Sequence, residues 1–89
     1  MRPEAAAVRQ LATDGASLPQ VVDYLRHHGT GPVTHLSVHR ALMQAFDARL
    51  MPVRRLFDHF GPEWELLRPP EEIDVGWRAF LRVYLPDAP

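Results

Sequence analysis

The chain has 89 residues, of which 46% are hydrophobic and 24% are charged, and its net charge is -1. This length suits a single domain with one hydrophobic core, and the charge balance argues against general nucleic-acid binding, where a basic stripe supplies most of the affinity. The absence of cysteine excludes disulfides and thiolate chemistry.

Two helices are predicted in the first third of the chain. Pro3 suits the first turn of a helix that runs through EAAAVRQLAT and ends at Gly15. The segment SLPQVVDYLRHHG has an N-cap at Ser17, a capping-box residue at Gln20 and a stop at Gly29. The apolar face of this second helix carries Val21, Val22 and Leu25.

Two further helices are predicted in the middle of the chain, after a break at residues 30–32. The third helix repeats apolar side chains at helical spacing up to Asp47: Leu36, Val38, His39, Leu42, Met43 and Phe46. The fourth begins just before Pro52, because proline in a helix interior removes a hydrogen bond and clashes, and it ends at Gly61. Its inward side chains are Val53, Leu56, Phe57 and Phe60, and its outward ones are Arg54, Arg55 and Asp58. The short segment DARL makes the two helices an αα-hairpin.

The last third of the chain combines a connection and a final helix. PEWELLRPP, residues 62–70, has prolines at both ends; we predict an extended connection, with a helical one as the open alternative. From Glu71 to Leu85 the helical pattern returns, with acidic residues in the first turn and Pro86 as the stop. Its apolar stripe consists of Ile73, Trp77, Phe80, Leu81 and Tyr84. No alternating run predicts a strand, so we expect an all-α fold: one domain over residues 1–89, a compact bundle of four to five short helices with a central αα-hairpin.

His35 and His39 are four residues apart, which is the spacing of a metal-binding pair on one helix face. A zinc site needs three or four protein ligands, and no further ligand stands at a motif spacing, because the sequence is HLSVH and not HExxH. Third ligands could come only from distant residues: Asp47, His59, His27 or His28. We therefore favour packing of His39 beside the core and expect no metal and no cofactor.

The sequence also offers little support for a catalytic site. Ser17 is explained as a helix cap, and Ser37 lies outside any GxSxG motif. Glu71 and Glu72 suit the first turn of a helix better than a general acid and base. We therefore expect no enzymatic activity.

A helix-turn-helix that binds DNA is the main alternative, because Arg54 and Arg55 follow the turn between the two central helices. The segment from Met51 to Phe60 offers only these two arginines, Asp58 and His59 around a wide apolar face. Recognition helices usually expose more basic and amide side chains, so this remains the second hypothesis.

The segment LSVHRALMQAFDARLMPVRRLF, residues 36–57, resembles the helical hairpin in the C-terminal domain of the bacterial ribosomal stalk protein. Arg40 falls on a basic position of the family's first helix, and Arg54 falls on the second lysine of its Lys-Glu-Ala-Lys run. The matching apolar positions are Leu36, Val38, Leu42, Ala45, Leu50, Val53, Leu56 and Phe57. With SLPQVVDYLRHHG before it and FGPEW after it, the chain is similar to small stalk-like proteins of actinobacterial type.

This resemblance implies a three-stranded sheet beside the hairpin and a surface that recruits translational GTPases. It would place Val38, Arg40 and Arg54 in the contact patch. Asp47 and Arg49 stand where the family has glycines, Pro52 stands where it has glutamate, and the family's strand before the hairpin is here a predicted helix.

We predict a small, cytoplasmic, non-enzymatic protein-binding module whose contact face is the central hairpin, with Val38, Arg40, Arg54 and Arg55 in contact with the partner. The apolar runs are too short to span a bilayer, and the N-terminus does not resemble a signal peptide. The partner is expected to be another protein: a translation-type factor, a regulatory protein, or a toxin that this chain neutralises as an antitoxin would. The oligomeric state stays open, although small bundles often complete their cores as homodimers.

Overall fold

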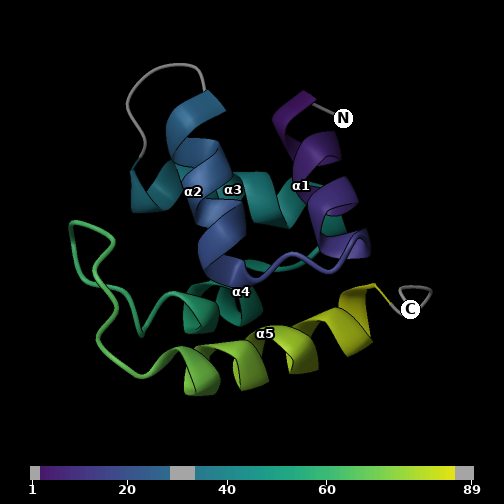
Figure 1. Ribbon diagram of the computed structural model, residues 1–89. Coiled ribbons are helices and arrows are strands. Elements are labelled where there is room, and N and C mark those ends of the chain that lie inside the picture. Colours follow the sequence, from purple (N-terminus) through teal and green to yellow (C-terminus); the bar gives the residue numbers. More distant parts are fainter. Residues whose placement is uncertain (1–2, 29–33, 86–89) are drawn as a thin grey trace.

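The computed structural model describes residues 3–28 and 34–85, and these ranges contain five helices and no β-strand beyond one isolated bridge. The helices are α1 (Pro3–Thr13), α2 (Leu18–His28), α3 (His35–Phe46), α4 (Leu50–Leu56) and α5 (Pro70–Tyr84). Figure 1 shows α1 and α2 in front of α3, with α5 along the lower edge of the bundle. The predicted all-α class is confirmed, whereas the sheet implied by the stalk-protein resemblance is not found in the described residues, where α2 takes the place of its strand.

Capping boxes begin two of the helices. At the start of α2 the backbone N–H of Ser17 donates to Oε1 of Gln20 at 2.8 Å, and the N–H of Gln20 donates to Oγ of Ser17 at 3.3 Å, as predicted. Thr34 and Ser37 form the same reciprocal pair at the start of α3, with N···O distances of 2.9 and 3.1 Å. This second capping box was not predicted. The proposed stops at Gly29 and Pro86 lie outside the described residues.

The turn between α3 and α4 depends on Asp47, which takes the left-handed conformation with φ 51°. The carbonyl of Met43 accepts from two backbone N–H groups, that of Asp47 and that of Ala48, the latter at 3.0 Å, and this closes the last turn of α3. The chain then reverses at once into α4 and forms the predicted hairpin with α3.

α4 is shorter than the sequence predicts. It ends at Leu56, because the next N–H groups bond three residues back: Phe57 to the carbonyl of Arg54 at 3.0 Å and Phe60 to the carbonyl of Phe57 at 3.1 Å. The prediction of a helix up to Gly61 was therefore wrong. Both phenylalanines are nevertheless buried, as predicted.

The segment that follows is a folded loop, so the predicted extended connection was also wrong. The N–H of Gly61 donates to the carbonyl of Glu65 and the N–H of Leu67 donates to the carbonyl of His59, each at 2.8 Å. Trp64 reverses the chain between these bonds with a φ of 67°. The loop folds back because Trp64 packs on Phe57 and Phe60 at ring-centroid distances of 6.0 and 6.1 Å.

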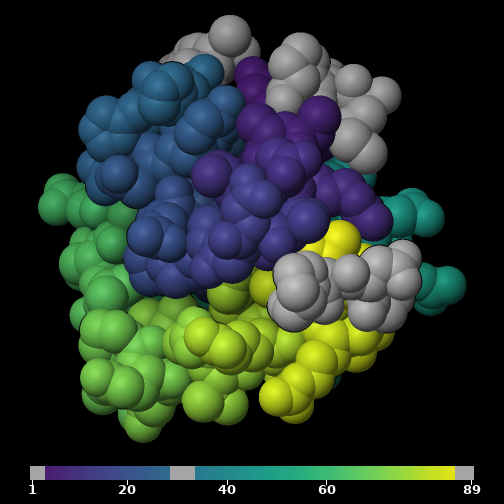
Figure 2. Space-filling model, turned by 45° about the vertical axis from the view of Figure 1, so that its right-hand side comes forward, coloured from purple at the N-terminus to yellow at the C-terminus, as the bar shows by residue number. Residues whose placement is uncertain are grey.

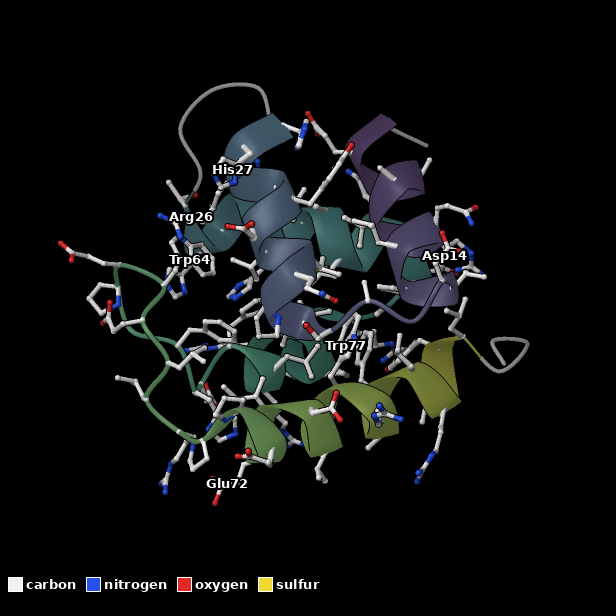
Figure 3. The ribbon with its side chains drawn as sticks, in the orientation of Figure 1. Asp14, Arg26, His27, Trp64, Glu72 and Trp77 are labelled. Atoms are coloured by element: carbon white, nitrogen blue, oxygen red, sulfur yellow. The ribbon has the colours of Figure 1, made fainter. Side chains whose placement is uncertain are left out.

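Trp77 joins the last helix to the rest of the core. It is 1% exposed, it meets Phe46 of α3 edge to face at 5.9 Å, and it stacks on Phe80 at 5.8 Å. Its indole N–H donates to the carbonyl of Ala16, in the connection between α1 and α2, at 2.9 Å. Figure 3 shows Trp77 extending from α5 toward the first two helices. Among the described helices, none combines the length and apolar character needed to cross a membrane.

Candidate functional site

Val38 does not belong to an exposed contact face. It is 1% exposed and forms part of the core, on the face of α3 that also buries Leu42 and Ala45. α3 lies against α1, and Arg9 of α1 donates to the carbonyl of Ala45 at 2.9 Å across this contact. The expectation that Val38 contacts a partner is therefore corrected, because its side chain is buried in the core and is not accessible to another protein.

The other three predicted contact residues, Arg40, Arg54 and Arg55, are all exposed. None of their guanidinium groups forms a hydrogen bond or an ion pair with any residue in the described ranges. In contrast, Arg78 of α5 is held by Asp74 at 2.7 Å. The three hairpin arginines therefore keep their donors available for another molecule.

An exposed apolar side chain precedes each of these arginines by four residues. The pairs are Leu36 and Arg40 on α3, Leu50 and Arg54 on α4, and Met51 and Arg55 on α4. Residues four apart lie on the same helix face, so each apolar side chain stands one turn from its arginine. We call these six residues the hairpin surface.

The apolar part of the hairpin surface is substantially exposed: Leu36 is 56% exposed, Leu50 43% and Met51 54%. Leu36 was expected to point inward with the apolar stripe of α3, and that prediction was wrong. The buried face of α3 centres on Val38 and Leu42, whereas Leu36 lies on the opposite side of the helix with Arg40. The apolar stripe predicted from the sequence therefore covers a wider part of α3 than the face that is buried.

The two histidines of α3 pack against aromatic rings. His35 stacks on Trp64 with ring centroids 4.1 Å apart, and His39 meets Phe57 at 4.9 Å. The Nε2 of His35 is 3.0 Å from the carbonyl oxygen of Gly61; because a carbonyl can only accept, this nitrogen carries the proton. The described residues include no group of three or more His, Cys, Asp or Glu side chains able to hold a metal ion. The pair acts as part of the packing between α3, α4 and the loop.

The surroundings of His39 favour its neutral form. Burial lowers its pKa below the usual 6.5, and repulsion from His35 and from the guanidinium of Arg54 lowers the pKa further, while Asp58 acts in the opposite direction. Its Nε2 is buried and has no hydrogen-bond partner in the described residues. The positive charge of the hairpin surface at neutral pH therefore comes from its arginines and not from His39.

The residues considered for catalysis serve the helix ends. Ser17 and Ser37 each belong to a capping box. Glu71 and Glu72 are exposed in the first turn of α5. The sequence did not predict that Leu36, Leu50 and Met51 are exposed. The signal was present in the sequence, because each of these apolar residues is followed four positions later by an arginine.

No protein-family model matches the chain, and no curated protein or solved structure is significantly similar to it.

Proposed function

We propose that this chain is a cytoplasmic, non-enzymatic binding module that contacts another protein through the hairpin surface. The observation that carries the proposal is the set of three apolar residues and three unpaired arginines, arranged as pairs one helical turn apart. Methionine and arginine are enriched in protein interfaces relative to the rest of the surface. Arginine is also among the residues that most often dominate binding energy, because its planar donors can bind a carboxylate with two hydrogen bonds.

The chemistry of the hairpin surface defines the partner that would fit it. Leu50 and Met51 would enter an apolar depression, and Arg40, Arg54 and Arg55 would pair with Asp or Glu side chains around it. The partner is therefore a protein with an acidic rim around an apolar patch. A translation-type factor is favoured by the resemblance of the hairpin to the ribosomal stalk protein, and a regulatory protein or a toxin would fit the same chemistry.

The test compares two variants that lose the same charge in different places. Arg54→Ala/Arg55→Ala changes the hairpin surface, whereas Arg26→Ala/Arg68→Ala removes two exposed arginines that also have no ion pair in the described ranges. Each tagged protein is incubated with cell extract, and captured proteins are quantified by mass spectrometry. The wild type and the matched control should capture the same partner in equal amounts. The hairpin variant should capture about tenfold less of it, or less still. Equal capture by all three proteins would contradict the proposal.

A helix-turn-helix function remains the second candidate. It would place α4 in the major groove, and this helix has seven residues, of which Leu50 and Met51 expose apolar side chains where base-reading donors would be needed. The geometry therefore supports it less well. A salt-sensitive shift of duplex DNA at low ionic strength, abolished by Arg54→Ala/Arg55→Ala but not by Arg26→Ala/Arg68→Ala, would favour it over protein binding.

A further inference from the structure

The outward face of α5 carries a second apolar stripe. Val75 and Val83 are each 69% exposed, the highest value among the large hydrophobic residues that the structure describes. They are eight residues apart with the exposed Ala79 midway, so all three lie on one face of the helix. The opposite face carries the buried Ile73 and Trp77. We call Val75, Ala79 and Val83 the outer α5 stripe.

The views of the molecule show where α5 lies relative to the rest of the bundle. In Figure 2 the yellow-green and yellow atoms of α5 form the lower front of the molecule, with α2 above them. In Figure 3 Glu72 points away from the bundle, on the side of α5 opposite Trp77. The outward side of α5 therefore faces away from the core formed by the described residues.

Gly76 lies beside this stripe, in the interior of the helix. Glycine there lowers helix stability relative to alanine. A Cβ added to Gly76 would meet nothing within 4 Å, so no close contact inside the described chain accounts for the glycine. It leaves room for the backbone or side chain of another molecule to approach α5 closely.

The charges at the two ends of the stripe are opposite. Glu71 and Glu72 stand in the first turn of α5, and Arg82 stands in the last turn. The guanidinium of Arg82 has no hydrogen bond or ion pair in the described ranges, whereas that of Arg78 is already paired with Asp74. A helix that matches this face must therefore be basic where α5 begins and acidic where α5 ends.

A second copy of α5 running in the opposite direction meets this requirement. In such a pair, Glu72 of each copy lies near Arg82 of the other, and Val75 of each copy lies near Val83 of the other. A two-fold axis through the region of Ala79 produces both contacts twice, as a self-complementary interface requires. The antiparallel arrangement also places the opposite ends of the two helix dipoles together.

We propose that the outer α5 stripe is a homodimer interface in which two copies of α5 pack antiparallel. This goes beyond the proposed hairpin function and does not depend on it. One pair of short helices buries less than the ~1,000 Å² expected of a stable interface, so the dimer is weak and dissociates on dilution.

The first test measures the association state of the purified full chain by sedimentation velocity over a concentration series. The wild type should shift from monomer to dimer as concentration rises. Val75→Gln/Val83→Gln should raise the dissociation constant by at least about tenfold, because the apolar area buried at the interface is lost. Leu36→Gln/Leu67→Gln is the matched control: these leucines are 56% and 59% exposed elsewhere on the surface, and their replacement should leave the dimer unchanged.

Charge reversal tests the antiparallel orientation. Glu72→Arg and Arg82→Glu should each weaken the dimer, because each creates like-charge contacts at both ends, and the combination of the two should restore it. Gly76→Ala should raise the thermal midpoint of the monomer and weaken the dimer. A wild type that stays monomeric at every concentration would overturn the proposal. So would a dimer that survives Val75→Gln/Val83→Gln, or charge reversals that the combined variant does not rescue.

Discussion

The imidazole of His35 lies flat on the indole of Trp64, with ring centroids 4.1 Å apart and 9° between the ring planes. The same histidine bonds through Nε2 to the carbonyl of Gly61 at 3.0 Å. These two contacts therefore join the first turn of α3 to the loop after α4 and stabilise the position of both. This contact fixes the end of the hairpin at which Leu36 is exposed.

The backbone of Trp64 provides a test of this contact. At φ 67° a non-glycine residue is strained, so the tryptophan is held there by its ring contacts. Trp64→Ala should lower the free energy of unfolding by about 2 kcal/mol, because the packing is lost while the strain stays. Trp64→Gly should recover about 1 kcal/mol of that loss, since glycine tolerates positive φ. Urea unfolding followed by circular dichroism measures both variants, and an alanine variant as stable as the glycine variant would refute the account of Trp64.

His39 predicts a dependence of stability on pH. Burial, His35 and Arg54 lower its folded-state pKa, and Asp58 opposes them only in part. As pH falls through 6.5, the unfolded chain takes up the proton before the folded chain does, so the stability present above pH 6.5 is progressively lost toward the lower folded-state pKa. The effect of this single side chain should be small. His39→Leu should lose less stability than the wild type between pH 7.5 and 5.5, about the range in which histidine titrates; parallel stability curves for the two proteins would rule out this role.

Trp77 should be the most sensitive position of the core with respect to hydrogen bonding. Trp77→Phe removes the 2.9 Å bond to the carbonyl of Ala16 and leaves a void in a site that is 1% exposed. The expected cost is roughly 2 to 4 kcal/mol of unfolding free energy. Chemical unfolding monitored at 222 nm measures it, and Tyr84→Phe, on the same helix but only partly buried, serves as a milder control. A loss below about 1 kcal/mol would show that the bond to Ala16 contributes little.

Asp47 sets the hairpin turn through its φ of 51°. Asp47→Gly should raise the free energy of unfolding by about 0.5 to 1 kcal/mol, and with it the thermal midpoint, because glycine is the preferred residue in this conformation. Asp47→Val should lower stability by about 1 to 2 kcal/mol, since a β-branched residue is strained there. Differential scanning calorimetry compares the two variants. If the valine variant matched the wild type, the turn would not depend on the left-handed residue.

Those helices whose ends carry local chemical signals were predictable from the sequence. α2 begins directly after Ser17, because Ser17 and Gln20 form the capping box that the sequence predicts. α5 starts with prolines and glutamates that suit a helix N-terminus. The stripe of Ile73, Trp77 and Phe80 is buried as its spacing predicts. These features depend on residues within one or two turns of each other.

The loop after α4 could not be predicted in the same way. Its course depends on Trp64, which contacts His35 from nearly thirty positions earlier in the chain, and on a backbone conformation that tryptophan rarely adopts. The early end of α4 at Leu56 has the same origin, because Phe57 and Phe60 turn to pack on Trp64. Periodicity indicates which side chains share a helix face, but it does not indicate where tertiary contacts end the helix.

The candidate site was predicted only in part for a related reason. The sequence placed Arg54 and Arg55 outward, as they are, but it counted Leu36 in the apolar stripe of α3, and the stalk-protein resemblance assigned Val38 to the contact face. Both errors concern which face of α3 is covered by α1, and that depends on the arrangement of helices in space. Once this face is known, the three pairs of apolar residue and arginine become apparent.

Photo-cross-linking from Met51 in the hairpin surface tests the central claim most directly. A photoreactive amino acid is introduced at Met51 and, as a control, at the exposed Asp14 between α1 and α2, in cells that naturally produce the protein. Irradiation should join the Met51 probe to another polypeptide, and adding Arg54→Ala/Arg55→Ala should abolish that adduct. No adduct beyond the Asp14 background, or an adduct that persists without the two arginines, would contradict the assignment of the hairpin surface as a protein-binding face.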